Sequence, residues 1–229
     1  MKRIVLCSLV ILFFSGTALQ AGLMSPPSMA RKFLIEPHGA VGISMMGGEL
    51  PDGHDQVMGV GFAYSGGVSF GYAPVNAGAV MFGVEYTGKP FIIHGDHPTW
   101  GKYTDTINTN FIDILFGWKG YVSYFYYEVG LFLGPKVGKW EYARVYDDKD
   151  VQRITKDSAP NGDIDEDNAD HDFGVYAGLG ASLPVASFLR IDFGVQMQAA
   201  FVPAYESSAA DTSLTTVVML FKAGFTFLI

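Results

Sequence analysis

The chain of 229 residues is almost without cysteine, and its one cysteine, Cys7, lies in the leader segment described below. Disulfide bonds are therefore not expected to stabilise the remainder. Helical patterns of any length are missing too. Residues 57–84 carry no charge over 28 positions, but they hold seven glycines and a proline. These residues cost a helix interior roughly 1 and 3 kcal/mol each, so the stretch is not a membrane helix.

Basic residues are also scarce. The sequence has 15 Lys and Arg against 23 Asp and Glu, for a formal charge of −8. Removing Lys2 and Arg3 with the leader changes this charge to −10. Nucleic-acid binding needs a basic patch, so that class of partner is excluded.

The leader has the form of a secretory signal peptide. Lys2 and Arg3 precede an apolar run at 4–14, and small and polar residues follow at 15–21. The run is too short to span a membrane. We expect cleavage after Ala18 or Ala21.

Strict alternation then indicates β-strands. In the segment Leu189 to Phe201, every odd position is apolar, whereas the even ones include Arg190, Asp192 and Gln196. Side chains leave a strand on alternate faces, so period two is typical of a strand. The same reading predicts eight strands, at 33–46, 57–72, 77–91, 107–119, 121–140, 172–183, 188–202 and 214–229.

The connections alternate between short turns and long polar loops. Short turns are expected near 73–76, 119–120 and 184–187, and long loops at 47–56, 92–106, 141–171 and 203–213. In an up-and-down meander, this alternation puts all long loops at one end, as in outer-membrane barrels with short periplasmic turns.

The two faces of the strands indicate which side meets lipid. On the second strand, one face is almost all glycine, alanine and serine, and the other carries Val60, Phe62, Tyr64, Phe70 and Tyr72. A soluble barrel would expose lysine and glutamate rather than glycine, whereas small residues suit the crowded interior of an eight-stranded barrel. A soluble lipid-binding barrel is the alternative. The prediction is an all-β fold, an eight-stranded antiparallel up-and-down transmembrane β-barrel in the cell outer membrane.

The C-terminal segment F-K-A-G-F-T-F-L-I strengthens this prediction. Across nearly the whole chain after the leader, the architecture resembles the small eight-stranded outer-membrane proteins of the OmpA transmembrane-domain, OmpX and OmpW type. That resemblance implies that Phe221, Phe225, Phe227 and Ile229 form the β-signal read by the barrel-assembly machinery, although such signals usually end in phenylalanine or tryptophan. The division expected is 1–21 signal peptide, 22–32 periplasmic N-terminal segment and 33–229 transmembrane β-barrel.

Charged residues collect on the face expected to line the lumen. Because a buried charge is tolerated only when it is paired, we expect Lys222 and Arg190 to face the acids in a network. This network acts either as a structural plug or as a gate, in which the charged residues change partners to let small solutes pass. The predicted members are Glu36, Asp113, Glu128, Arg190, Asp192 and Lys222. Four apolar residues share this face and allow an apolar upper cavity: Met81, Phe111, Leu115 and Phe132.

Tyrosine and tryptophan beside the turns predict interfacial girdles, with Trp118, Tyr121 and Tyr72 at the periplasmic side. The loop at 146–172 is strongly acidic. Asp163, Asp165 and Asp167 resemble the start of an EF-hand loop, but Asn168 and Gly174 stand where glycine and glutamate belong. These three acids are therefore weak metal candidates beside the simpler reading of a solvated loop.

No catalytic motif accompanies the barrel pattern. His171 has no adjacent serine in a recognisable motif, Ser158 and Ser182 could approach it only by accident of folding, and G-x-S-x-G is absent. We therefore expect no enzyme and no cofactor. Two functions remain open, which are a surface-binding or structural protein displaying four external loops, and an OmpW-like narrow channel for small or hydrophobic solutes. The expected partners are outer-membrane lipid, the barrel-assembly machinery and a possible host or small-solute ligand, with the protein a monomer.

Overall fold

The structure is a computed structural model that describes residues 29–48, 57–97, 101–138, 141–146, 154–155, 171–201, 205–207 and 212–229. Within those residues, no helix is long and apolar enough to cross a membrane.

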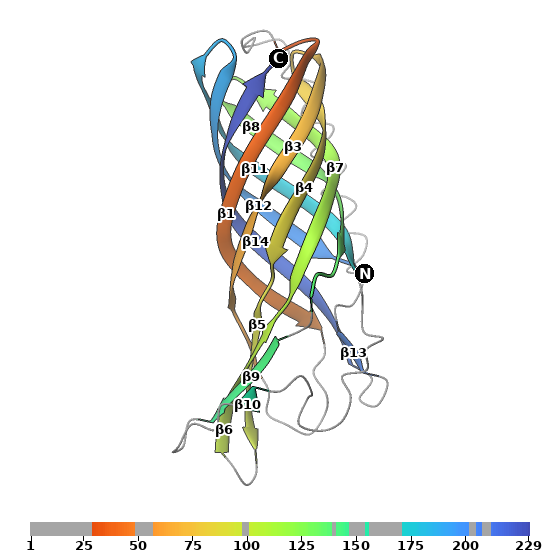
Figure 1. The fold of residues 1–229 in the computed structure, drawn as a ribbon, viewed down its shortest axis with the longest axis vertical. Helices are drawn as coiled ribbons and strands as arrows, with labels where there is room; N and C mark the ends of the chain where they lie inside the picture. Colours follow the sequence, from red (N-terminus) through yellow and green to blue (C-terminus); the bar gives the residue numbers. More distant parts are fainter. Residues whose placement is uncertain are drawn as a thin grey trace.

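Eight long antiparallel strands form a closed barrel (Figure 1). Each strand pairs with the next barrel strand along the chain, and the last pairs with the first over the register Leu34 to Leu228 through Gly48 to Leu214. This up-and-down closure confirms the predicted fold class. The barrel strands are β1 (Lys32–Gly48), β3 (Gly61–Val75), β4 (Gly78–Gly88), β7 (Asn110–Val122), β8 (Phe125–Pro135), β11 (His171–Ala186), β12 (Leu189–Ala200) and β14 (Thr212–Leu228). The short strand β13 (Tyr205–Ser207) extends the pairing of β14.

The three short turns lie at the end of the barrel that holds the C-terminus (Figure 1), and we call this the periplasmic end. One predicted turn, at 119–120, is wrong. Strand β7 continues to Val122, and the chain turns at Ser123, which has a positive φ of 58°. Gly120 is there for packing, because a Cβ atom at this position would lie 2.1 Å from Cζ of Tyr127. Lys119 is therefore part of a strand, and its side chain is buried.

A second sheet of five strands extends beyond the opposite, external end of the barrel (Figure 1). Its strands come from three different connections, between β1 and β3, β4 and β7, and β8 and β11. The sequence prediction of plain loops at 92–106 and 141–171 is wrong where these strands lie. We call this the external sheet. Its order is β10 (Ile154–Thr155), β9 (Glu141–Tyr146), β6 (Gly101–Asn108), β5 (Phe91–His97) and β2 (Val57–Gly59).

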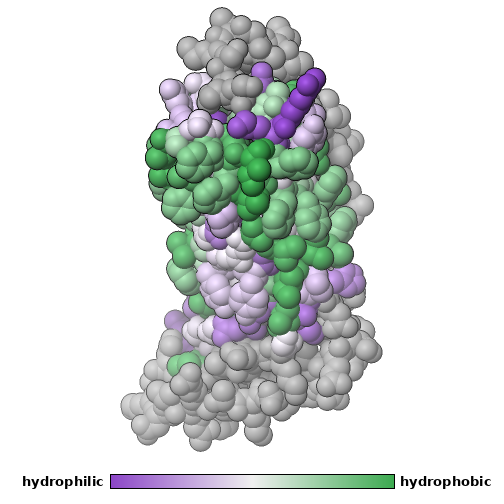
Figure 2. Space-filling model, turned by 45° about the horizontal axis from the view of Figure 1, so that its top comes forward, coloured by the Kyte–Doolittle hydropathy of each residue, from purple (hydrophilic) through white to green (hydrophobic). Residues whose placement is uncertain are grey.

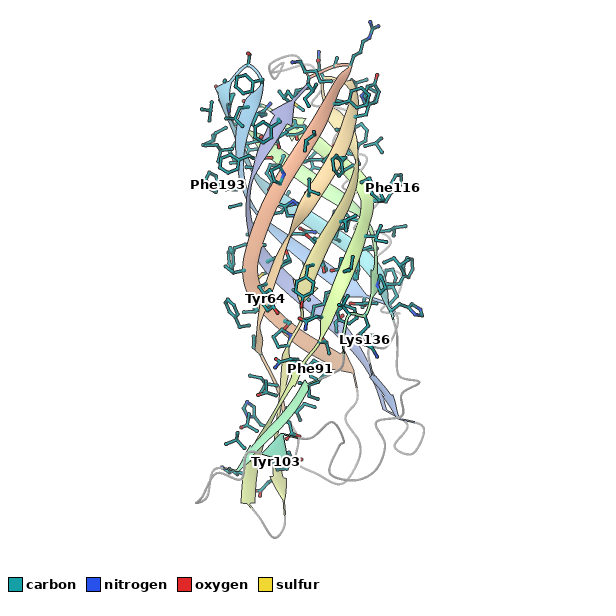
Figure 3. All side chains as sticks on the ribbon, in the orientation of Figure 1. Tyr64, Phe91, Tyr103, Phe116, Lys136 and Phe193 are labelled. Carbon is teal, nitrogen blue, oxygen red and sulfur yellow. The ribbon has the colours of Figure 1, made fainter. Side chains whose placement is uncertain are left out.

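Large apolar side chains cover the outside of the barrel, and we call them the belt. Every barrel strand contributes exposed members, and Figure 2 shows many of them in green across the upper part of the visible face. Phe116 and Phe193 point away from the barrel on opposite sides in Figure 3. Soluble proteins rarely expose so large a continuous apolar surface, so the belt excludes the soluble lipid-binding barrel. One member from each strand in chain order is Val41, Phe70, Phe82, Phe116, Leu131, Leu179, Phe193 and Phe221.

Replacing Phe116 by arginine tests the belt. The Phe116 side chain is 59% exposed, and an arginine facing lipid near mid-membrane costs about 2–4 kcal/mol. We therefore expect the free energy of unfolding in lipid vesicles, measured by urea titration, to fall by about that amount. Val145→Arg, at a 39% exposed position in the external sheet, is the control and should change it by less than about 0.5 kcal/mol. Equal effects at the two positions would contradict a lipid-facing belt.

Candidate functional site: two ionic clusters in the lumen

The interior of the barrel is filled by side chains, many of them charged. Both signs are present, which is what allows charges to be buried. The buried acidic residues of the lumen are Glu36, Glu85, Asp113, Glu128, Asp172 and Asp192. The buried basic residues are Lys89, Lys119, Arg190 and Lys222. In the part of the chain that is described, these charges fall into two clusters.

The first cluster, the periplasmic cluster, is centred on Lys119 of β7. Its Nζ donates to Glu36 Oε2 of β1 at 2.7 Å and to Asp192 Oδ2 of β12 at 2.8 Å. Thr226 of β14 also donates to Asp192, at 2.6 Å. The ring of Tyr126 lies under the ammonium, with its centroid 4.2 Å from Nζ. Lys119 thus ties three strands together across the lumen.

Lys222 of β14 extends the periplasmic cluster. Its Nζ lies 3.6 Å from Glu36 Oε1 and 3.6 Å from Glu128 Oε2 of β8. Glu128 needs Gly178 opposite it, because a Cβ there would lie 2.7 Å from Glu128 Oε1. Glu36 is therefore shared by two lysines, one on each carboxylate oxygen.

His38 of β1 connects this cluster to the middle of the barrel. Its Nδ1 lies 3.0 Å from the carbonyl oxygen of Glu36, and its Nε2 lies 3.0 Å from Glu85 Oε2 of β4. Gln198 of β12 donates to the other oxygen of Glu85 at 2.9 Å. Both ring nitrogens of His38 thus lie within hydrogen-bond distance of an oxygen atom, one on β1 and one on β4.

The second cluster, the external cluster, is centred on Lys89, just after β4. Its Nζ lies 3.1 Å from Asp113 Oδ2 of β7 and 2.9 Å from Asp172 Oδ2 of β11. The rings of Phe111 and Phe132 flank the ammonium at 4.9 and 4.6 Å. These aromatic faces stabilise a desolvated cation further.

The structure brings together three members of the predicted network, which are Glu36, Glu128 and Lys222. Asp192 joins them, but through Lys119. Asp113 instead belongs to the external cluster, which is a correction to the predicted single network.

Arg190 also differs from the prediction, which paired it with acids. Its hydrogen bonds go to Ser182 Oγ at 2.9 Å, to the Ser182 carbonyl at 3.0 Å and to Met29 Sδ at 3.1 Å. Ser182 in turn donates to Asp192, so this hydroxyl connects Arg190 to the periplasmic cluster.

Three charged residues that hold the clusters together were not among the predicted network members: Lys89, Lys119 and Asp172. Lys119 was assigned to a turn. Lys89 continues the inward alternation of Glu85 and Thr87, and Asp172 shares the inward parity of Tyr176. The alternation therefore predicts that both side chains point into the lumen, even though each is a single charged residue at the end of its strand.

The remaining predicted residues fall as follows. Met81, Phe111, Leu115 and Phe132 are buried in the lumen as expected, whereas Tyr121 is buried there as well and does not belong to an interfacial girdle. His171 and Ser182 lie at opposite ends of β11. The proposed β-signal residues Phe221, Phe225, Phe227 and Ile229 lie on the outer face of the last strand and at its end.

The metal candidates Asp163, Asp165 and Asp167 lie outside the described residues. Among the residues that are described, no three His, Cys, Asp or Glu side chains are grouped to hold a metal ion.

Comparison with known proteins gives a likeness at the level of the fold. No family model and no curated protein matches the chain. Among solved structures, the Neisserial surface protein A is 12% identical with a TM-score of 0.38, covering 85% of this chain and 96% of its own. Ail, the attachment invasion locus protein of Yersinia pestis, is 12% identical with a TM-score of 0.39, covering 86% and 99%. The outer membrane protein OprG from Pseudomonas aeruginosa is 13% identical with a TM-score of 0.34, covering 90% and 99%.

The barrel's own features carry the assignment. A closed barrel has no unpaired edge in the hydrocarbon, the belt faces outward, and the charges are paired inside. The chain therefore has the fold of the small eight-stranded outer-membrane β-barrel proteins.

Proposed function

We propose that this protein is a closed barrel that conducts no solute and acts as a membrane anchor for a surface-binding external sheet. The observation that carries the proposal is the pair of ionic clusters. Each central lysine holds acids from two other strands at 2.7–3.1 Å, so opening a path would break several buried ion pairs at once. Breaking one such pair costs about 3–5 kcal/mol, which favours a plug over a gate that re-pairs.

The external sheet supports the binding role. Three connections contribute strands to it, so it is a paired β-structure rather than separate loops. Phe91, Tyr103 and Ile107 are buried in it, while His94, Asp96 and Lys102 are exposed. Figure 3 shows Phe91 at the foot of the barrel, where the extension begins, and Tyr103 farther down the extension. A surface of this kind, held by a rigid scaffold, is a common place for binding residues.

The same proposal covers the expected partners. The belt binds outer-membrane lipid, the C-terminal strand is read by the barrel-assembly machinery, and a host molecule binds the external sheet. We propose no catalytic role and a monomeric barrel.

Conductance across a planar bilayer tests the closed barrel. The refolded protein, confirmed as folded by its heat-dependent gel mobility, should give no discrete openings, while a water-filled porin in the same bilayer gives them. Lys222→Ala should also remain silent, because the Lys119 and Lys89 ion pairs persist. Reproducible wild-type openings that change in size on Lys222→Ala would overturn the proposal in favour of a narrow channel.

A further inference from the structure

The chain just before β1 folds back under the periplasmic mouth of the barrel. The Lys32 amide donates to the Met29 carbonyl at 3.1 Å, and Arg31 has a positive φ of 64°. A hydrogen bond from residue i+3 to residue i defines a tight turn. This turn directs Met29 into the barrel, where its side chain is fully buried. The predicted division had placed Met29 in a separate periplasmic segment.

Contacts from distant parts of the barrel hold the turn in place. The Ala30 amide donates to Asn76 Oδ1 at 3.0 Å, and the Arg31 amide donates to the Ala73 carbonyl at 2.7 Å. Ala73 lies near the end of β3, and Asn76 lies in the turn between β3 and β4. Arg190 of β12 donates to Met29 Sδ at 3.1 Å. The turn is thus attached to parts of the barrel that lie far apart along the chain.

Met29 belongs to an apolar layer at this mouth. The layer includes residues from β1, β3, β4, β7, β8 and β14, and the Arg190 guanidinium lies 5.3 Å from the ring of Tyr121 within it. Arg190 and Tyr121 link this layer to the periplasmic cluster. Members of the layer are Met29, Leu34, Ala73, Ala79, Met81, Tyr121, Tyr126 and Leu228.

We propose that residues 29–32 form a latch that closes the periplasmic mouth of the lumen. With the latch seated, Met29 completes the apolar layer and covers Arg190. With the latch released, Arg190 and the ion pairs behind it become reachable from the periplasm. The latch goes beyond the proposed function, because it controls access from one side whether or not a continuous path exists.

The near absence of cysteine allows a direct test. With Cys7 in the leader, Ala79→Cys gives the mature barrel a single thiol within the apolar layer. Its reaction with a charged, membrane-impermeant methanethiosulfonate reagent should be slow with the latch intact. Adding Met29→Gly and Asn76→Ala should speed it by tenfold to a hundredfold, on the order expected from losing a buried methionine and its local closure.

Two controls keep the result interpretable. Met45→Gly, at an exposed methionine near the other end of β1, should leave the rate unchanged. Val185→Cys, at an exposed position near the end of β11, reports the intrinsic reactivity of the reagent. If Ala79→Cys does not fold by gel mobility, Ser182→Cys serves as the buried thiol. A labelling rate that is the same with and without Met29 would overturn the latch. The conductance measurement tests the closed barrel and not the latch, so the two proposals can fail separately.

Discussion

Replacing Lys119 by methionine is expected to lower the free energy of unfolding of the barrel by about 3–5 kcal/mol. The lysine holds Glu36 and Asp192 at 2.7 and 2.8 Å, and all three side chains are buried. Methionine keeps most of the apolar stem against Tyr126 but leaves two carboxylates without their main partner. Urea unfolding of the protein in lipid vesicles, followed by tryptophan fluorescence and gel mobility, measures the loss.

Two variants separate the ion pairs from general damage to the fold. Lys102→Met removes an exposed lysine of the external sheet and should change stability by less than about 0.5 kcal/mol. Adding Glu36→Gln and Asp192→Asn to Lys119→Met should recover part of the loss, because neutral amides no longer leave buried charges unpaired. If Lys119→Met alone costs under about 1 kcal/mol, the periplasmic cluster does not brace the barrel.

Replacing Lys89 by methionine is expected to cost a similar amount, about 3–5 kcal/mol, at the other end of the lumen. Asp113 and Asp172 then lose their shared cation, and the contacts of the ammonium with Phe111 and Phe132 disappear. The same urea titration measures this loss. Thr216 still donates to Asp172 at 3.0 Å, so we expect the loss of Lys89 to destabilise Asp113 more than Asp172.

Double-mutant cycles give this second prediction its control. Lys89→Met and Asp172→Asn should couple by roughly 1 kcal/mol or more, since the two groups share a buried hydrogen bond. Lys89→Met and Lys119→Met should instead add within about 0.5 kcal/mol, because the two lysines share no carboxylate. Strong coupling between the two lysines would show that the lumen is one network rather than two clusters.

The alternation of buried and less buried residues continues in the external sheet. Residues 101–108 read G-K-Y-T-D-T-I-N, and Tyr103, Asp105 and Ile107 are buried while their neighbours are not. Period two is therefore present there too. Threonine, lysine and aspartate make up much of residues 101–106, and this polarity predicts a loop there in spite of the alternation. Strands that leave the membrane lose the apolar face that makes barrel strands easy to recognise.

The sequence by itself determined the barrel strands, the face that meets lipid and the presence of paired charges inside. These follow from local chemistry: alternation fixes which side chains share a face, and lipid and a narrow lumen demand opposite side chains. Only the tertiary structure decided which charges meet. Tilt and stagger of the closed barrel set the level at which each strand's residues lie, so Asp113 pairs with Lys89 rather than with Lys222. The same closure brings Met29 to Arg190 across 161 positions of sequence, which no local pattern can encode.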